Sequence, residues 1–208
     1  MPPAKGNEAR RHHFVPQFYL RNFARDGKIG SANLQSRKVF TQVVRKAASV
    51  NDFHSLPGHP EGTDAFEKVL SKVESSAAKV IAQASGQGIR SLSPGQRSEL
   101  AFFSALQYAR SPNQRRSMES IRAEMIRLEV GFGGRHQTAS WAEENLGLTN
   151  ASEETIQQIW DEATRPGGPP TRVSPAEHIS QLSEIVEELW TYLVGRPILH
   201  VRFEGVHC

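Results

Sequence analysis

The stretch of sequence that decides the fold is SPGQRSELAFFSALQYAR, residues 93–110. It opens on a capping box with proline at the first helical position, because the Ser93 hydroxyl can accept from the Gln96 amide while the Gln96 side chain reaches back. Apolar residues then cover almost the whole circumference of the predicted helix. Such a helix is usually central and buried. Residues 94–110 therefore predict the core helix of a mostly helical protein.

Similar start signals, together with apolar residues at three- and four-residue spacing, predict the helices around it. We expect these helices at residues 64–85, 112–130, 151–164 and 175–194, with a shorter one near 140–146. Residues 28–45 read as a β-hairpin with a polar turn at 35–38. The predicted fold class is α+β, predominantly α: a bundle of about five or six helices with a small N-terminal β-hairpin head.

The chain of 208 residues, 38% of them hydrophobic, is long enough for one domain with its own core. Within that single domain the composition indicates four parts. We expect a flexible basic tail at 1–10, a basic head with the hairpin at 11–62, a helical bundle at 63–195, and a terminal strand and tail at 196–208.

Charge is distributed unevenly along the chain. Residues 1–50 contain ten Lys or Arg and two acidic residues, a net charge of +8, whereas the remainder carries −5. A basic head could bind nucleic acid or another phosphate-bearing ligand, or it could dock on the protein's own acidic helices. The single cysteine, Cys208, excludes an intrachain disulfide, and no apolar run reaches the roughly 18–20 residues of a membrane span. We expect a cytoplasmic protein with no membrane partner, and the sequence does not indicate an oligomeric state.

The most specific chemical signal is RHHFVPQ, residues 11–17. Adjacent histidines in a strand point to opposite faces, so they rarely bind one metal ion together. We expect one working histidine, His13 in preference to His12, as the catalytic acid or base, with a divalent metal ion as a candidate cofactor. The block is similar to the opening of HNH-type nucleases, but the later histidine of that motif is missing at its usual spacing.

Further polar residues could join the two histidines in one cluster. The candidates for substrate binding are Arg11, Gln17, Asn22, Gln107 and Arg110, and the candidate partners of the histidines are His54, Glu67 and Glu74. Gln107 and Arg110 share one face of the apolar central helix, where buried polar groups need partners. A structural ion pair between Arg110 and one of the two glutamates is the alternative to a role in substrate binding.

Four segments, in this order, are similar to the family called domain of unknown function 4238. They are RHHFVPQFYLRNF at 11–23, VNDFHSL at 50–56, FEKVLSKVE at 66–74 and QYARSP at 107–112. The resemblance covers residues 10–130 well and 170–200 loosely, and the family more often has tyrosine where His54 stands. It implies where the site lies but no mechanism, since the family has no established activity.

The end of the chain departs from the family pattern. Members tend to continue past a Pro-Phe strand into a Thr-Ser-Asp-x-Pro segment, whereas here the matching Arg196-Pro197 turns into a different sequence that ends at Cys208. The resemblance therefore implies a truncated copy, which would be inactive if that aspartate belongs to the active centre.

Two hypotheses follow from the sequence. In the first, His12, His13, Gln17, Glu74 and Arg110 form one polar cluster that binds a phosphate-bearing ligand or nucleic acid and hydrolyses it with a metal ion. In the second, the chain is a non-enzymatic helical module that binds a protein partner, and the head is a scaffold. Histidines beside a cleft, near Glu74 and Arg110, favour the first hypothesis, whereas imidazoles in open solvent favour the second.

Overall fold

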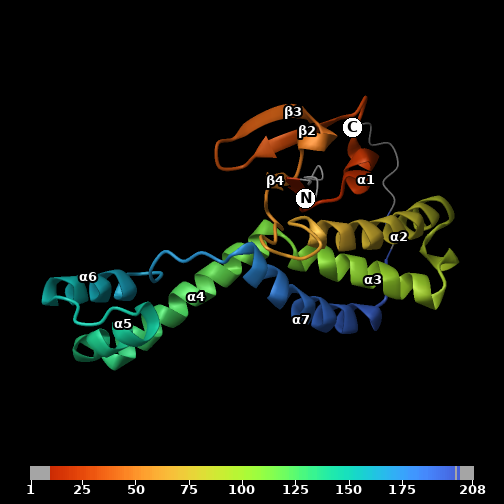
Figure 1. Cartoon of the computed structure of the whole chain (residues 1–208). Helices are drawn as coiled ribbons and strands as arrows, with labels where there is room; N and C mark the ends of the chain where they lie inside the picture. Colours follow the sequence, from red (N-terminus) through yellow and green to blue (C-terminus); the bar gives the residue numbers. More distant parts are fainter. Residues whose placement is uncertain (1–9, 200, 202–208) are drawn as a thin grey trace, which may run out of the picture. The chain divides into compact units, whose positions relative to one another are not determined.

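The computed structural model describes residues 10–199 and residue 201. Within them the chain forms seven α-helices and two separate two-stranded antiparallel sheets, which confirms the predicted α+β class with predominant helix (Figure 1). The structure separates into two compact units. The first contains the residues up to Ser111 together with those from Pro175 onward, and the second contains Pro112–Ser174. The sequence did not indicate this second unit, and the division into tail, head and bundle stays a prediction.

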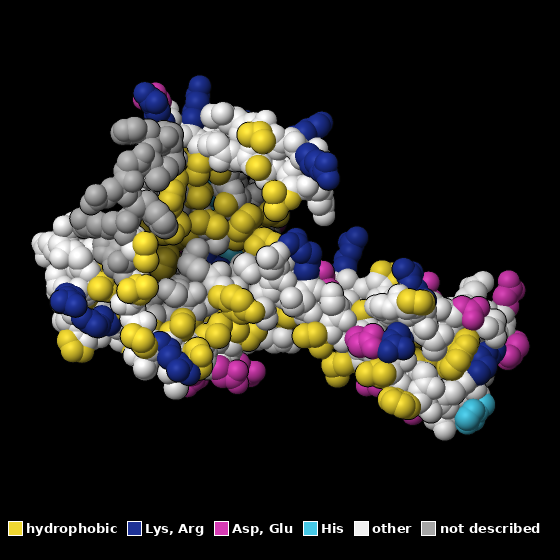
Figure 2. Space-filling view, turned by 180° about the vertical axis from the view of Figure 1, so that it is seen from behind, with side chains coloured by type: hydrophobic (Ala, Val, Ile, Leu, Met, Phe, Trp, Pro, Cys, Tyr) yellow, Lys and Arg dark blue, Asp and Glu magenta, His cyan; other side chains and the backbone are white. Residues whose placement is uncertain are grey.

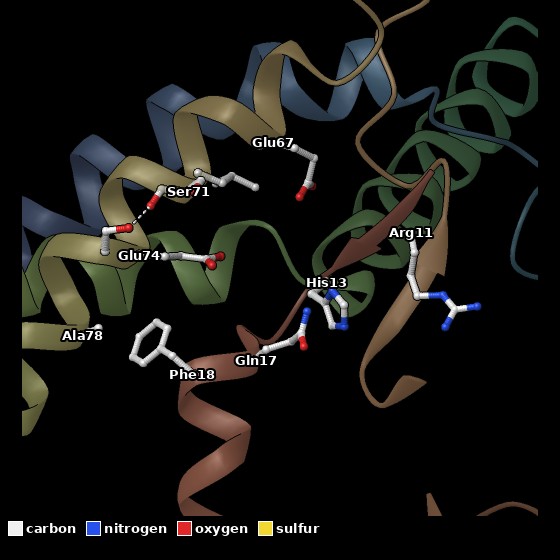
Figure 3. A pocket seen from close by; sticks show the side chains of 10 residues that line it. Arg11, His13, Gln17, Phe18, Glu67, Ser71, Glu74 and Ala78 are labelled. Carbon is white, nitrogen blue, oxygen red and sulfur yellow. Dashed lines mark hydrogen bonds between the residues drawn. The ribbon is translucent and has the colours of Figure 1, made fainter. Parts of the chain in front are cut away.

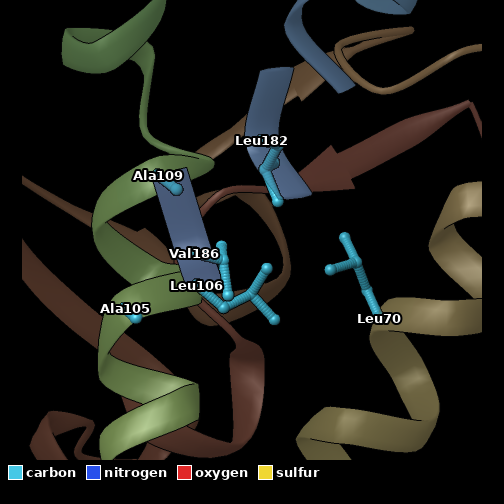
Figure 4. Close-up of a cluster of buried hydrophobic side chains, with 6 residues drawn as sticks. All are labelled: Leu70, Ala105, Leu106, Ala109, Leu182 and Val186. Carbon is cyan, nitrogen blue, oxygen red and sulfur yellow. The ribbon is translucent and has the colours of Figure 1, made fainter. Parts of the chain in front are cut away.

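Three helices build the core of the first unit. They are α2 (Ala65–Gln87), α3 (Pro94–Ala109) and α7 (Pro175–Val194), and α3 packs against both of the others. The side chains buried between them are Leu70 from α2, Ala105, Leu106 and Ala109 from α3, and Leu182 and Val186 from α7 (Figure 4). The helix predicted to be central therefore is central.

The predicted capping box at the start of α3 is present. The Ser93 hydroxyl accepts from the Gln96 amide at 3.3 Å, and the Gln96 side-chain oxygen accepts from the Ser93 amide at 2.9 Å. Both bonds satisfy donors that a helix N-terminus otherwise leaves without partners.

The head consists of two short sheets and one helical turn. Its elements are β1 (Arg11–His13), α1 (Gln17–Leu20), β2 (Lys28–Asn33), β3 (Lys38–Val43) and β4 (Ser49–Asn51), with 3-10 turns at Arg21–Phe23 and Val44–Lys46. Strands β2 and β3 form the predicted hairpin. Strand β1 pairs with β4, so that His12 stands opposite Val50. This second pairing was not predicted, and it brings the histidine block beside the segment that contains His54.

The hairpin presents a basic and partly apolar surface. Figure 2 shows Lys and Arg side chains at both of its ends, and hydrophobic side chains line the hollow beneath it. Val39 and Phe40 of β3 are exposed. Part of the positive charge expected of the head therefore lies on this hairpin.

The second unit contains three helices, α4 (Pro112–Gly133), α5 (Thr138–Leu146) and α6 (Glu153–Thr164), and α6 packs against the other two. An irregular segment then returns along α4. The Thr171 hydroxyl donates to the carbonyl of Glu119 at 2.6 Å, and the Val173 amide donates to the Glu119 carboxylate at 3.1 Å. These bonds attach the segment to α4.

Two of the expectations concern the chain ends. The expected tail lies almost wholly outside the described residues, and so does most of the expected terminal strand. Residues 197–199 and 201, which the structure does describe, are not in a strand. Among the helices of the described residues, none combines the length and the apolar character that crossing a membrane requires.

Candidate functional site

A cavity of about 400 Å³ lies between the head and α2, both in the first unit. We call it the His13 cleft. The head lines it with Arg11, His13, Gln17 and Phe18 (Figure 3). Helix α2 lines it with residues that share one helix face, namely Glu67, Leu70, Ser71, Glu74, Ser75 and Ala78. Five of the residues predicted from the sequence to form the site therefore border one cavity: Arg11, His13, Gln17, Glu67 and Glu74.

The imidazole of His13 is held in one orientation by the backbone. Its Nε2–H donates to the carbonyl oxygen of Arg45 at 3.1 Å, so the neutral ring carries its lone pair on Nδ1. Burial lowers the pKa of His13 below its ordinary value, and the bond to Arg45 opposes this only in part. A half-buried imidazole that is neutral near pH 7 and fixed through one nitrogen is suited to accept a proton at the other.

Behind the cleft lies a buried group formed by His12, His54 and Glu67. His12 is 1% exposed and His54 is 0% exposed, and their rings stack with centroids 5.9 Å apart. The backbone N–H of His54 donates to Nδ1 of His12 at 2.8 Å, and the Nδ1–H of His54 donates to the Glu67 carboxylate at 2.7 Å. Burial lowers the pKa of His54, although Glu67 opposes that shift. Glu67 is 22% exposed and also lines the His13 cleft, so one carboxylate joins the buried group to the cavity.

This buried group has the composition of a metal site. His12, His54 and Glu67 each offer one ligand atom, and these atoms lie within 4.8 Å of one another. Two histidines and one glutamate form a ligand set found in catalytic zinc sites, where a fourth position stays open for water or substrate. The two Nδ1 atoms take part in hydrogen bonds here, so a metal ion would have to replace those bonds and the proton on His54. The Nε2 atom of His54 is buried and has no hydrogen-bond partner among the described residues.

Arg110 lies behind the other end of the cleft. Its guanidinium is 0% exposed and donates to the Glu74 carboxylate at 2.7 Å and to the side-chain oxygen of Gln107. The Gln107 amide donates onward to the carbonyl of Phe14, the residue after His13. Burial raises the pKa of Glu74, and Arg110 opposes this shift by attracting the charged form. The sequence alternative of an ion pair between Arg110 and a glutamate is present in the structure.

The remaining candidates lie elsewhere. The side chain of Asn22 is directed to the carbonyl of Phe18 at 3.5 Å, and it does not line the cleft. Gln107 and Arg110 are connected to the cleft wall but are not part of its lining. They would therefore act on a substrate only through the lining residues that they bond.

Sequence reasoning missed some residues of the region. Ser71 and Ser75 line the cleft, and their spacing of four residues from Glu67 and from each other on α2 would have placed them on the same face. Phe18, which no pattern in the sequence singled out, also lines the cleft. His178 of α7 is buried and lies 6.4 Å from the His54 ring, centroid to centroid, while its Nε2 bonds the carbonyl of Ala109. No local sequence signal indicated the position of His178.

Comparison with known proteins identifies a family. The model of a family described as "Protein of unknown function (DUF4238)" matches residues 11–175, a segment that includes every residue of the His13 cleft. No curated protein and no solved structure matches the chain.

Proposed function

Because the chain belongs to the DUF4238 family of proteins of unknown function, its function has to be inferred from the site, and we propose that it is a metal-assisted hydrolase of a phosphate-bearing ligand that binds in the His13 cleft. The observation that supports this most directly is the double position of Glu67. This carboxylate belongs to the buried His12–His54–Glu67 group and also to the lining of the cleft. A metal ion held by the group would therefore lie at the wall of the cavity that contains His13.

The charges around the cleft support the need for a metal ion. Glu67, Glu74 and Arg11 all line the cleft, and Arg110 bonds Glu74 from outside the lining. With two carboxylates and two guanidinium groups, the region has no excess of positive charge to hold a phosphate dianion. A divalent cation would supply it, and it would also polarise the phosphoryl oxygen and lower the pKa of water.

His13 supplies the second requirement of hydrolysis, a base. A water molecule attacks the phosphorus atom, and the Nδ1 lone pair of His13 accepts the proton that the water loses. The new bond is between the water oxygen and phosphorus. The bond to the ester oxygen breaks, and that oxygen takes a proton from solvent. The lowered pKa of His13 favours this role, because the ring is then neutral and ready to accept a proton at pH 7.

The surroundings of the histidines support a site rather than a scaffold. His12 is buried, and His13 is half-buried beside Glu74 in the same cavity. The non-enzymatic hypothesis requires both imidazoles to face open solvent, and neither does. The outer hairpin, with Lys and Arg at both ends, would raise the local concentration of anionic ligands near the cleft.

The test is a hydrolysis assay on a phosphomonoester and a phosphodiester of p-nitrophenol, with Mn²⁺, Zn²⁺, Mg²⁺ or EDTA. We expect metal-dependent turnover that falls by about 10²-fold or more in His13→Gln, as is typical when a general base is removed. His59→Gln is the matched control, because His59 is exposed and lies outside the cleft. Turnover that is absent with every metal, or equal in wild type and His13→Gln, would contradict the proposal.

A further inference from the structure

We propose that the ligand of the His13 cleft is a nucleoside phosphate unit, with its base against Phe18 and its phosphate between Arg11 and His13. This inference rests on the proposed function for the location of the reacting phosphate, and it goes further by naming the rest of the ligand. It follows from the unequal chemistry of the two ends of the cavity. Arg11 lies at one end, and Phe18 lies with Ala78 at the other, while His13 and Gln17 lie between them (Figure 3).

Phe18 provides a flat apolar wall. Its ring packs against Phe103 of α3 with centroids 5.8 Å apart and a tilt of 45°, which holds the ring from the side of the core. The ring also borders the cavity, as do Leu70 and Ala78. This apolar part of the lining, which we call the slot, suits a planar aromatic group, and stacking of bases on aromatic side chains is widely used by proteins that bind single nucleotides of a strand.

Polar groups with both donors and acceptors stand beside this slot. Gln17 and Ser71 line the cavity, and Ser75 lines it while its hydroxyl donates to the carbonyl of Ser71 at 2.7 Å. Neutral amide and hydroxyl groups next to an apolar slot can bond the edge of a base or the hydroxyls of a sugar. A simple phosphate ion, or an alkyl phosphate, would leave these groups and the Phe18 ring without a ligand partner.

The opposite end is suited to the phosphate. The Arg11 guanidinium is exposed at this end, and a guanidinium matches two phosphate oxygens at once. The cavity of about 400 Å³ has the size of a small-molecule site, which admits one nucleotide unit and is too small for a duplex. The unit could belong to a free nucleotide or to the end of a single strand, since both present the same base, sugar and phosphate.

The experiment is a calorimetric titration of the full chain with adenosine 5′-monophosphate, ribose 5-phosphate and inorganic phosphate, each with Mn²⁺ present. We expect adenosine 5′-monophosphate to bind about tenfold or more tightly than ribose 5-phosphate, because stacking of the base contributes this much. Equal affinities for these two compounds would overturn the inference. A single-stranded oligoadenylate is the second arm: tighter binding than that of the monophosphate identifies a strand as the source, and similar binding identifies a free nucleotide.

Variants of Phe18 link the preference to the slot. Phe18→Leu should lower the affinity for adenosine 5′-monophosphate about tenfold and leave that for ribose 5-phosphate unchanged, whereas Phe18→Tyr should keep the preference. Phe23→Leu is the control, because Phe23 is exposed and lies outside the cleft. An equal loss for both ligands in Phe18→Leu would contradict a base at this position. If the protein prefers adenosine 5′-monophosphate as expected but hydrolyses neither compound, the proposed hydrolase is wrong and this inference holds. If the protein hydrolyses both compounds and binds them with equal affinity, the hydrolase holds and this inference is wrong.

Discussion

The Nδ1 atom of His54 lies 2.7 Å from a carboxylate oxygen of Glu67, and the imidazole is completely buried while the carboxylate keeps part of its surface at the His13 cleft. A histidine with no solvent contact is thus connected to the cavity through a single hydrogen bond. A proton added to this ring goes to Nε2 and strengthens its attraction to Glu67, whereas a metal ion that binds Nδ1 has to replace the bond to Glu67. The next two predictions follow from this connection.

The stability of the protein should decrease as the pH falls below about 6.5. Burial lowers the pKa of both His13 and His54 in the folded state, so the unfolded chain binds more protons than the folded chain below the ordinary histidine pKa. Their contribution to stability is therefore complete above pH 6.5 and is lost as the pH falls toward the folded values. Each histidine can contribute a slope of up to about 1.4 kcal/mol per pH unit.

The measurement is urea unfolding between pH 7.5 and 5.5. We expect a smaller slope of the unfolding free energy against pH in His54→Phe, since that variant lacks one of the two titrating rings. His59→Gln should keep the wild-type slope. The raised pKa of Glu74 acts in the opposite direction: its contribution is present below the ordinary glutamate pKa and is lost as the pH rises through the folded value. An unchanged slope in His54→Phe would show that His54 does not titrate in this range.

Binding of a metal ion by His12, His54 and Glu67 should change the tautomer of His54. In the structure Nδ1 of His54 donates to Glu67, so the proton on this nitrogen has to move to Nε2 before Nδ1 can bind a cation. Imidazole with carboxylate suits Zn²⁺ or Mn²⁺ better than Mg²⁺ or Ca²⁺, which prefer oxygen ligands. Titration with Zn²⁺ followed by ¹⁵N NMR of the histidine rings should show this change of tautomer.

The same titration has two controls. Glu67→Gln keeps the shape of the side chain but removes its charge, and we expect it to weaken Zn²⁺ binding at least tenfold. Glu61→Gln removes the charge of an exposed glutamate outside the three-ligand group and should leave the affinity unchanged. A wild-type protein whose melting temperature is the same with Zn²⁺ and with EDTA does not bind this metal in its folded state.

Arg110 should be the most costly single residue of the site to replace. Its guanidinium is buried and bonds Glu74 and Gln107, so Arg110→Met leaves a half-buried carboxylate and an amide without their partner. Loss of one member of a buried pair costs about 3–5 kcal/mol, and we expect the lower end because Glu74 keeps 24% of its surface exposed. Arg165→Gln, which removes an exposed pair with Glu162, should cost at most about 1 kcal/mol.

A double variant separates the lost pair from lost packing. If Arg110→Met is destabilising because it leaves the Glu74 carboxylate without a partner, then adding Glu74→Gln to this variant should restore part of the unfolding free energy. Additive losses in the double variant would contradict this account. Chemical unfolding of the four proteins of the cycle supplies the numbers.

Local patterns in the sequence predicted the helices well, because a helix depends on residues three and four positions apart. The Ser93 capping box gave α3 its observed start, and the spacing of apolar residues located α2 and α7. The grouping of helices into two units depends on which faces meet in space. Which faces pack together depends on residues far apart in the sequence, and the periodicity of one sequence does not show it.

The site was predicted in the same partial way. His13, Gln17 and Arg11 belong to one short block, and Glu74 lies on a predicted helix, so their candidacy followed from residue type and spacing. The close contact of His12 with His54 depends instead on the pairing of β1 with β4, two strands of three residues each. Strands this short have too few residues to show an alternating pattern. The burial of His54, and with it the three-ligand group, was therefore visible only in three dimensions.

The last prediction concerns the second unit and a glycine that has to stay a glycine. Gly168 has a φ of +72°, and a Cβ built on it would lie 2.1 Å from the carbonyl oxygen of Ala123 on α4. Gly167 has a similar φ of +83°, but a Cβ there would have no atom within 4 Å. Both substitutions to alanine incur the strain of a left-handed conformation, about 1–2 kcal/mol, and only Gly168→Ala adds a clash with backbone.

We expect Gly168→Ala to be less stable than Gly167→Ala by about 1–3 kcal/mol, the usual range for overpacking. Fluorescence of Trp141 and Trp160 reports the unfolding of this unit when Trp190 of the first unit is replaced by Phe in all proteins compared. Equal stability of the two variants would mean that residues 165–174 move away from α4 without cost, and the hydrogen bonds from Thr171 and Val173 to Glu119 argue against such freedom.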